Sequence, residues 1–318
     1  LAPGSDSGSS DSDNITNIST PSFIGTAEPG ATVTLYNGTA KVGTGIAGAD
    51  GTWSITAAAL AAGLRSITVK ATDAAGNTSA ASPVLAVTID KTIARPVRPD
   101  LVAASDTGVS NTDNLTSIAT PDFTGTAEAG SLVTLLDGTT PIGSAIATPA
   151  GIWTITAAPL ADGAHAIAVI ATDVAGNVSL ASVALTVTID SQMLAPSVPD
   201  MTAGTDKGVS NSDNITNDAT PTFTGTAEAG STITLLDGAT TIGTARASAA
   251  GVWNITSAPL ADGVHSISAG AQDAAGNLAT SAALAVTIDT LAPAAPPLAA
   301  LAPGSDSGSS DSDNITNI

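Results

Sequence analysis

Acidic side chains recur at five positions in each of three similar stretches of the sequence. They are the residues whose type and spacing best suit the binding of a metal ion. Fifteen of the chain's 28 acidic residues fall in these five columns. The columns are Asp6/Asp106/Asp206, Asp13/Asp113/Asp213, Glu28/Glu128/Glu228, Asp73/Asp173/Asp273 and Asp90/Asp190/Asp289. Clustered carboxylates without His or Cys suit Ca²⁺, a hard cation that accepts roughly six to eight oxygen ligands. We therefore predict that these fifteen residues ligate calcium, with acidic loops that only keep the surface soluble as the alternative.

The columns belong to an internal repeat, because the sequence is similar to itself when it is shifted by 100 residues. The segment Thr20–Gly38 reads TPSFIGTAEPGATVTLYNG, and its counterpart Thr120–Gly138 reads TPDFTGTAEAGSLVTLLDG. Self-similarity at a fixed period indicates tandem structural units. We expect Ig-like repeats at 1–90 (repeat 1, its first strand incomplete), 91–190 (repeat 2) and 191–289 (repeat 3). A linker and the start of a further repeat are expected at 290–318.

The residues Leu1–Ile18 and Leu301–Ile318 are identical, whereas the three repeats differ from one another. We interpret this as a second level of repetition, in which a block of three repeats recurs and the duplicated ends mark where the block starts again. Pro297–Asp306 is then expected to supply the complete first strand of the next repeat.

Short alternating segments separated by turn residues predict an all-β fold. The expected strands of repeat 2 are Asp100–Ser105, Pro121–Ala127, Leu132–Leu136, Pro141–Ala147, Ile152–Ala157, His165–Thr172 and Ala184–Ile189. Seven short strands of this kind are typical of an antiparallel β-sandwich. Asn37-Gly38 and its counterparts suit a type I′ hairpin turn. One Phe and one Trp per repeat are expected to anchor each core.

Strand direction predicts where the acids meet. An odd number of strands on an up-and-down path leaves the two ends of each domain at opposite poles, so that domains can follow one another end to end. Asp90 should then approach Glu128 and Asp173 across the first junction, and Asp190 should approach Glu228 and Asp273 across the second. The loop acids Asp106 and Asp113 should lie at the same end of repeat 2 as Asp190.

Composition excludes several functional classes. Eight basic residues face 28 acidic ones, giving a net charge of −20, so nucleic acid is not an expected partner. The absence of cysteine excludes a disulfide-stapled domain and any thiolate site. No apolar run in the sequence approaches the roughly 18–20 residues of a membrane span.

The string TPxFxGTAExG…TxTLxDG…GxWxIT…ATDxAGN…VTID resembles the bacterial Ig-like repeats of giant Gram-negative surface adhesins, the biofilm-associated and RTX-type proteins secreted by type I systems. The resemblance extends over all three repeats. It implies tandem Ig-like extender domains at the bacterial cell surface, with calcium at or near the junctions and the adhesive ligand bound elsewhere in the parent protein.

Two alternative functions remain open beside the structural extender. One is a ligand-binding Ig-like module, and the other is an extracellular fibre or sheath subunit that assembles by strand complementation. Catalysis is not expected, because His165 and His265 stand where repeat 1 has Arg65, and the serines have no His partner at a fixed spacing.

Overall fold

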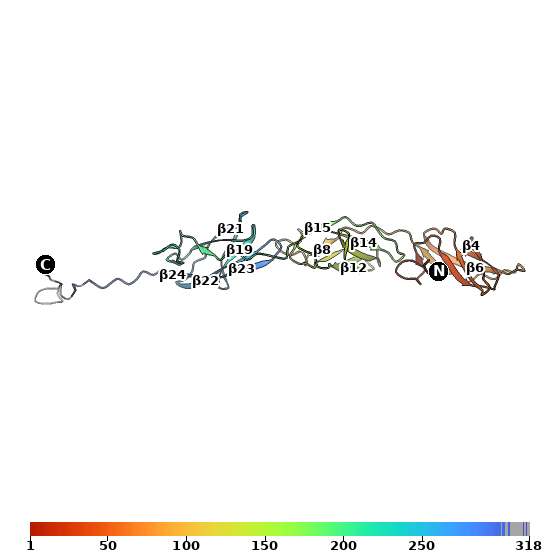
Figure 1. The fold of residues 1–318 in the computed structure, drawn as a ribbon, viewed down its shortest axis with the longest axis horizontal. Coiled ribbons are helices and arrows are strands. Elements are labelled where there is room, and N and C mark those ends of the chain that lie inside the picture. Colours follow the sequence, from red (N-terminus) through yellow and green to blue (C-terminus); the bar gives the residue numbers. More distant parts are fainter. Residues whose placement is uncertain (300, 303–304, 306–313, 315, 317–318) are drawn as a thin grey trace. The chain divides into compact units, whose positions relative to one another are not determined.

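The computed structural model describes residues 1–299, 301, 302, 305, 314 and 316, and every regular element among them is a β-strand (Figure 1). Repeat 2 contains eight strands. Its strands are β8 (Asp100–Leu101), β9 (Leu115–Thr116), β10 (Asp122–Thr126), β11 (Leu132–Asp137), β12 (Thr140–Ile146), β13 (Ile152–Thr156), β14 (Gly163–Thr172) and β15 (Leu185–Ile189).

The other two repeats follow the same plan. Repeat 1 contains β1 (Ile15–Thr16), β2 (Ser22–Thr26), β3 (Thr32–Asn37), β4 (Ala40–Ile46), β5 (Thr52–Thr56), β6 (Gly63–Thr72) and β7 (Leu85–Ile89). Repeat 3 contains β16 (Asp200–Met201), β17 (Ile215–Thr216), β18 (Thr222–Thr226), β19 (Thr232–Asp237), β20 (Thr240–Arg246), β21 (Val252–Thr256), β22 (Gly263–Gln272), β23 (Leu278–Thr280) and β24 (Leu284–Ile288).

Each repeat encloses its core between two sheets. In repeat 2 the sheets have the orders β12-β11-β14-β15-β9 and β13-β10-β8. Side chains alternate between the core and the solvent along β13, where Trp153 and Ile155 are buried. They pack with Phe123, Leu135 and Ile167 in one apolar cluster. The all-β sandwich fold and the role of Phe and Trp as core anchors are therefore confirmed.

The strand order corrects the expected up-and-down path. Neighbours such as β11 and β14 pair although two strands separate them in the chain. In an Ig-like sandwich the chain passes between the two sheets in Greek-key connections, so strands that are not consecutive pair with each other. The first predicted strand is also shorter than expected, since the Ser105 amide donates to the Val102 carbonyl in a turn. The sequence analysis missed β9, which pairs in parallel with β15.

The hairpin turn also differs from the prediction. Asn37 ends β3 and pairs with Ala40, so the turn residues are Gly38 and Thr39. Gly38 has a φ of +60°, whereas Asn37 is not among the residues with positive φ. A single positive φ at the first turn position is typical of type II′, not of the type I′ turn.

Two compact units divide the chain. Unit 1 comprises Leu1–Met193 with Asp273–Asn277, and unit 2 comprises Leu194–Gln272 with Leu278–Ile318. Unit 1 therefore holds the sheets of repeats 1 and 2 and one turn of repeat 3, whereas unit 2 holds the sheets of repeat 3. No helix among the described residues is long and apolar enough to cross a membrane.

Candidate metal centre

Asp90 is held by the pairing of two strands at the end of repeat 1. The two-residue strand β1 runs parallel to β7, with Thr16 opposite Ile89. The Asp90 amide continues this ladder by donating to the Thr16 carbonyl at 2.9 Å. The Asp90 side chain thus emerges at the last rung of repeat 1, next to the linker that leads into repeat 2.

Asp173 sits at the start of a tight turn that ends at Asn177. The Asn177 backbone amide donates to Asp173 Oδ1 at 2.8 Å, and Asn177 Nδ2 donates to Asp173 Oδ2 at 2.7 Å. Gly176 takes a φ of +90° inside the turn, a value that L side chains rarely adopt. Asp173 is only 4% exposed, so the turn presents a buried carboxylate.

Glu128 is the third member of the group and follows β10. Its backbone carbonyl accepts hydrogen bonds from the Ser131 amide at 3.1 Å and the Ser131 hydroxyl at 2.6 Å. One carboxylate oxygen from each of Asp90, Glu128 and Asp173 lies within 4.8 Å of the other two. The structure thus brings these three residues together across the contact between repeats 1 and 2, as strand direction predicted.

A loop of repeat 1 packs onto the Asp173 turn beside the three acids. The Ser7 hydroxyl donates to the Ala175 carbonyl at 2.7 Å, and the Ser9 amide donates to the Val174 carbonyl at 3.2 Å. Between them, Gly8 comes so close to Val174 that a Cβ on Gly8 would lie 1.9 Å from that carbonyl oxygen. These contacts hold the loop of repeat 1 against the turn that carries Asp173.

The donor set fits a calcium ion. Ligand oxygens on opposite sides of Ca²⁺, each at roughly 2.3–2.6 Å, lie at most about 5 Å apart. Among the described residues, the ion pairs involve Asp137, Asp218 and Asp237, so no Lys, Arg or His neutralises the three acids. Three like charges this close repel one another, and a divalent cation would remove the repulsion.

The Asp190 column repeats part of this arrangement within unit 1. One carboxylate oxygen of Asp190 lies within 4.8 Å of one from Asp273. Asn277 Nδ2 donates to the Asp190 carbonyl at 2.7 Å and to Asp273 Oδ2 at 2.8 Å. The predicted partner Glu228 belongs to unit 2, where its carbonyl accepts the Ser231 hydroxyl at 2.7 Å.

Three predicted ligands belong to no carboxylate group among the described residues, namely Glu28 and Asp289, which are exposed, and Asp73, which is partly exposed. Asp73 still forms the local turn, because Asn77 Nδ2 donates to Asp73 Oδ2 at 2.8 Å. The Asn77 side chain and amide hold the pKa of Asp73 below its usual value. The difference from Asp173 is that the described residues place no loop on this turn.

Asp6, Asp106 and Asp206 form a separate set of buried carboxylates. They are 7%, 5% and 2% exposed, respectively. In repeat 2, Asp106 Oδ2 accepts a hydrogen bond from the Asn114 amide at 3.2 Å, whereas Oδ1 has no hydrogen-bond partner. Burial, as the largest cause, raises the pKa of Asp106. A buried, unpartnered carboxylate oxygen in each repeat is a further place where a cation would fit.

The Asp13 column has a local structural role. In repeats 1, 2 and 3, respectively, Asp13, Asp113 and Asp213 accept a hydrogen bond from the amide two residues later through Oδ1. All three are exposed and join no carboxylate group among the described residues. As predicted, the Asp106–Asn114 loop lies at the Asp190 end of repeat 2, because the Asn114 carbonyl accepts the Thr188 amide at 2.9 Å.

The sequence did not single out two polar side chains that donate hydrogen bonds to backbone carbonyls of a different repeat. Asn177 Nδ2 donates to the Asp90 carbonyl at 3.0 Å, in addition to Asp173. Thr107, the counterpart of Ser7, donates to the Ala275 carbonyl at 2.7 Å. The recurring AGN after each Asp of the 73/173/273 column was the available signal, but it indicated only a turn.

Comparisons with known proteins agree with this architecture. The bacterial Ig-like domain family matches residues 1–91, 92–191 and 192–290. None of the curated proteins compared with the chain matches it.

Solved structures similar to the chain include a tetra-tandem repeat from the extending region of a large adhesion protein, at 22% identity and a TM-score of 0.31, covering 88% of this chain and 72% of that one. Another belongs to a 1.5-MDa bacterial ice-binding adhesin, at 21% identity and a TM-score of 0.32, covering 87% of this chain and 93% of that one. The fibronectin(III)-like modules of Clostridium thermocellum CbhA are similar at 21% identity and a TM-score of 0.34, covering 57% of this chain and 92% of that one. Because the family matches all three repeats, the chain belongs to the bacterial Ig-like domain family.

Proposed function

We propose that this chain is a structural extender of a large repetitive bacterial surface adhesin, in which Ca²⁺ at the repeat junctions holds successive Ig-like repeats in a fixed orientation. Its direct partners are the neighbouring repeats of the same chain. The extender would project a distal binding domain away from the cell for adhesion or biofilm formation.

The observation that carries this proposal is the acidic group at the first junction. Asp90 belongs to repeat 1, whereas Glu128 and Asp173 belong to repeat 2, so a cation bound by all three would join the two repeats. The absence of a cationic side chain from this group, and the burial of Asp173, favour a metal ion over a surface that is merely acidic. A soluble, charged face would need neither burial nor convergence.

The energetic effect of each site is expected to be modest and cumulative. Extracellular calcium modules bind with a Kd of roughly 10⁻⁴–10⁻³ M. At about ten times Kd, one site stabilises the bound arrangement by ~1.4 kcal/mol. The hydrogen bonds from Ser7 and Asn177 already set the orientation, so calcium would reduce the bending of an existing junction.

The direct test compares two matched substitutions. Glu128→Gln removes one charge from the group, and its counterpart Glu28→Gln changes an exposed residue outside any carboxylate group of the described residues. Calcium titration calorimetry should show Glu128→Gln weakening binding by about tenfold or abolishing one site, while Glu28→Gln leaves binding unchanged. Small-angle scattering with calcium and then with chelator should give a narrower distribution of distances in calcium.

Two outcomes would contradict the proposal. Equal calcium binding by the two variants would remove Glu128 from the ligand set. Superimposable scattering profiles with calcium and with chelator would mean that the hydrogen bonds and the Pro-rich linker alone set the junction.

A further inference from the structure

A carboxylate just before the long strand of repeats 2 and 3 holds the start of the linker that leaves the repeat. The Ser191 amide donates to Asp162 Oδ1 at 3.0 Å, and Gln192 Nε2 donates to Asp162 Oδ2 at 3.3 Å. In repeat 3, the Thr290 amide and hydroxyl donate to Asp262 Oδ1 at 2.9 and 2.8 Å. Hydrogen bonding, chiefly from Ser191, keeps the pKa of Asp162 below its usual value. The linker is therefore held by an ionised carboxylate, which is a stronger acceptor than a neutral group.

The loop that carries Asp162 is fixed by the repeat itself and not by the linker. The Leu160 amide donates to the Ala119 carbonyl at 2.8 Å. The residue after Asp162 is Gly163, which begins β14 and pairs with Ile189 near the end of β15. Asp162 thus stands one position beyond the last pair of these two strands, next to the point where the linker begins.

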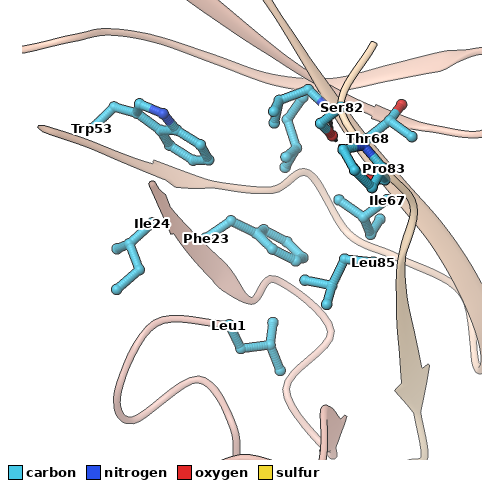
Figure 2. Close-up of a pocket in the computed structure, with 11 residues that line it drawn as sticks. Leu1, Phe23, Ile24, Trp53, Ile67, Thr68, Ser82, Pro83 and Leu85 are labelled. Carbon is cyan, nitrogen blue, oxygen red and sulfur yellow. Dashed lines mark hydrogen bonds between the residues drawn. The ribbon is translucent and has the colours of Figure 1, made fainter. Parts of the chain in front are cut away.

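Repeat 1 has the same scaffold without the carboxylate. Ile67 of β6 lies opposite Leu85 of β7. Figure 2 shows both side chains in the core beside Phe23. Ala62 stands at the position of Asp162. The two strands that meet where the linker begins are therefore alike in repeats 1 and 2, but only repeat 2 has an acceptor side chain there.

The first linker has a different contact, at its other end. Arg95 Nε donates to the Ala181 carbonyl at 2.5 Å, so the linker is held by the repeat that it enters. Ala195 stands at the corresponding position of the second linker and has no such donor. The linker that lacks the Asp162 contact thus has Arg95, and the linker that lacks the Arg95 contact has Asp162.

Either contact shortens the part of the linker that can bend. Backbone hydrogen bonds already hold the second half of each linker on the repeat that it enters. In the first linker, Arg95 extends this hold, so that residues 91–94 remain between the two repeats. In the second linker, Asp162 holds the start, so that residues 193–195 remain. A shorter free stretch has fewer conformations and allows the linker fewer directions.

We propose that Asp162 and Asp262 are positioning residues that set the direction in which the linker leaves their repeats, and that Arg95 has this role in the first linker. The inference rests on the proposed extender function, because a fixed linker direction matters to a spacer. It does not rest on calcium, since none of the three residues belongs to a carboxylate group suited to a metal in the described part of the chain.

Distances between spin labels test the two kinds of contact separately, and the chain has no cysteine of its own to interfere with labelling. Cysteines would replace Ala40, Thr140 and Thr240, which are equivalent and exposed, and would be labelled in pairs. Asp162→Ala should broaden the 140–240 distribution by about 1.3-fold, as expected when the free stretch grows from 193–195 to 191–195. It should leave the 40–140 distribution unchanged, whereas Arg95→Ala should broaden only the 40–140 distribution.

All of these measurements are made in excess chelator, so their result does not depend on the proposed calcium sites. An unchanged 140–240 width in Asp162→Ala would overturn the proposal, as would equal broadening of both distances by one variant. The unfolding temperature should stay close to that of the native chain, because Asp162 is exposed. Broadening together with a clearly lowered unfolding temperature would also overturn the proposal, since Asp162 would then support the fold of repeat 2.

Repeat 1 allows the reverse experiment. Ala62→Asp combined with Arg65→His gives its loop the residues of repeat 2. Arg65 is replaced because its guanidinium donates to the Ala62 carbonyl and would pair with the new carboxylate. Hydrogen exchange of the Lys91 amide should become about three- to tenfold slower, and Asp162→Ala should speed exchange of the Ser191 amide by a similar factor. If exchange at Lys91 does not slow, the carboxylate is not what holds the start of the linker.

Discussion

Asn177 Nδ2 donates a hydrogen bond to the backbone carbonyl of Asp90, which lies 87 positions earlier in the chain, at 3.0 Å. The same amide group donates to Asp173 Oδ2 at 2.7 Å. Asn177 therefore links the last residue of repeat 1 to the turn of repeat 2, and it aligns two of the three acids in the candidate metal centre.

Replacement of Asn177 by Ala should loosen the first junction. The change removes both side-chain bonds and leaves the partly buried Asp90 carbonyl without this donor, at a cost of about 1–2 kcal/mol. Hydrogen exchange of the linker at 91–99 should become faster in the variant. The matched control is Asn77→Ala, which breaks the same local turn in repeat 1, where the turn is exposed. Equal changes at 91–99 in the two variants would contradict the linking role.

Gly8→Ala should disrupt the same junction by a steric route. A Cβ at Gly8 would lie 1.9 Å from the Val174 carbonyl oxygen, a distance that requires the loop or the turn to move. Gly8 also has a φ of +99°, so part of the effect is local strain of about 1 kcal/mol. Gly4→Ala controls for that strain, because Gly4 has a φ of +79° and no atom within 4 Å of the added Cβ.

Thermal unfolding and limited proteolysis of the linker would compare these two glycine variants. We expect Gly8→Ala to lower the unfolding temperature more than Gly4→Ala, and to expose the linker at 91–99 to protease. If both variants lose the same stability and neither exposes the linker, the close approach of Gly8 to Val174 does not hold the junction.

Much of the fold follows from local patterns in the sequence. The alternation around Trp153 and Ile155 predicts β13 because the two side chains must face one core. The meeting of Asp90, Glu128 and Asp173 was also predictable, although the expected strand order was wrong. The direction of a strand decides at which end of the domain its last residue lies. The order of the strands in the sheet does not change this.

Other features depend on contacts that no local pattern encodes. The strand β9 has two residues, too few for a period to show, and it forms only because β15 offers an edge. The burial of Asp106 arises when its loop folds back so that the Asn114 amide can donate to it, with Asn114 at a φ of +60°. The sequence marks both residues as polar and cannot indicate that one of them becomes buried.

Asp106→Asn tests the cost of that buried carboxylate. In chelator, the substitution should raise the unfolding free energy of repeat 2 by about 1 kcal/mol, because an unpartnered buried charge is removed while an acceptor for the Asn114 amide is kept. Burial raises the pKa of Asp106 in the folded state, so protonation of this carboxyl as the pH falls favours the folded state of the native chain. The advantage of the variant should therefore shrink as the pH falls toward 4.

Chemical unfolding at neutral and acidic pH, with and without calcium, distinguishes the two roles open to Asp106. If Oδ1 ligates a cation, calcium should stabilise the native chain more than the variant and reverse their order. If the variant is less stable than the native chain in chelator at neutral pH, the Asp106 carboxylate does not destabilise the folded state.

We expect His165 and His265 to give repeats 2 and 3 a histidine-dependent change of stability with pH, because repeat 1 has Arg65 at this position. His165 Nδ1 lies 2.8 Å from Asp137 Oδ2, and Nε2 lies 2.8 Å from the Ala161 carbonyl, so the protonated ring donates to both. Burial opposes the charge, but these two hydrogen bonds and the Asp137 carboxylate raise the pKa of His165 above 6.5. The pKa of His265 is raised as well, chiefly by its bond to the Ala261 carbonyl.

The sign of the effect follows from the raised pKa values. Protonated histidine stabilises the folded state fully below pH 6.5, and this stabilisation is lost as the pH rises through the higher folded-state value. Repeat 1 has Arg65 at this position, and its guanidinium donates to the Ala61 carbonyl at 2.9 Å. The double variant His165→Arg, His265→Arg keeps the cation at every pH. Its unfolding temperature should stay level from about pH 5.5 to 8.5, whereas that of the native chain should fall; parallel profiles would exclude the histidines as the source of the pH dependence.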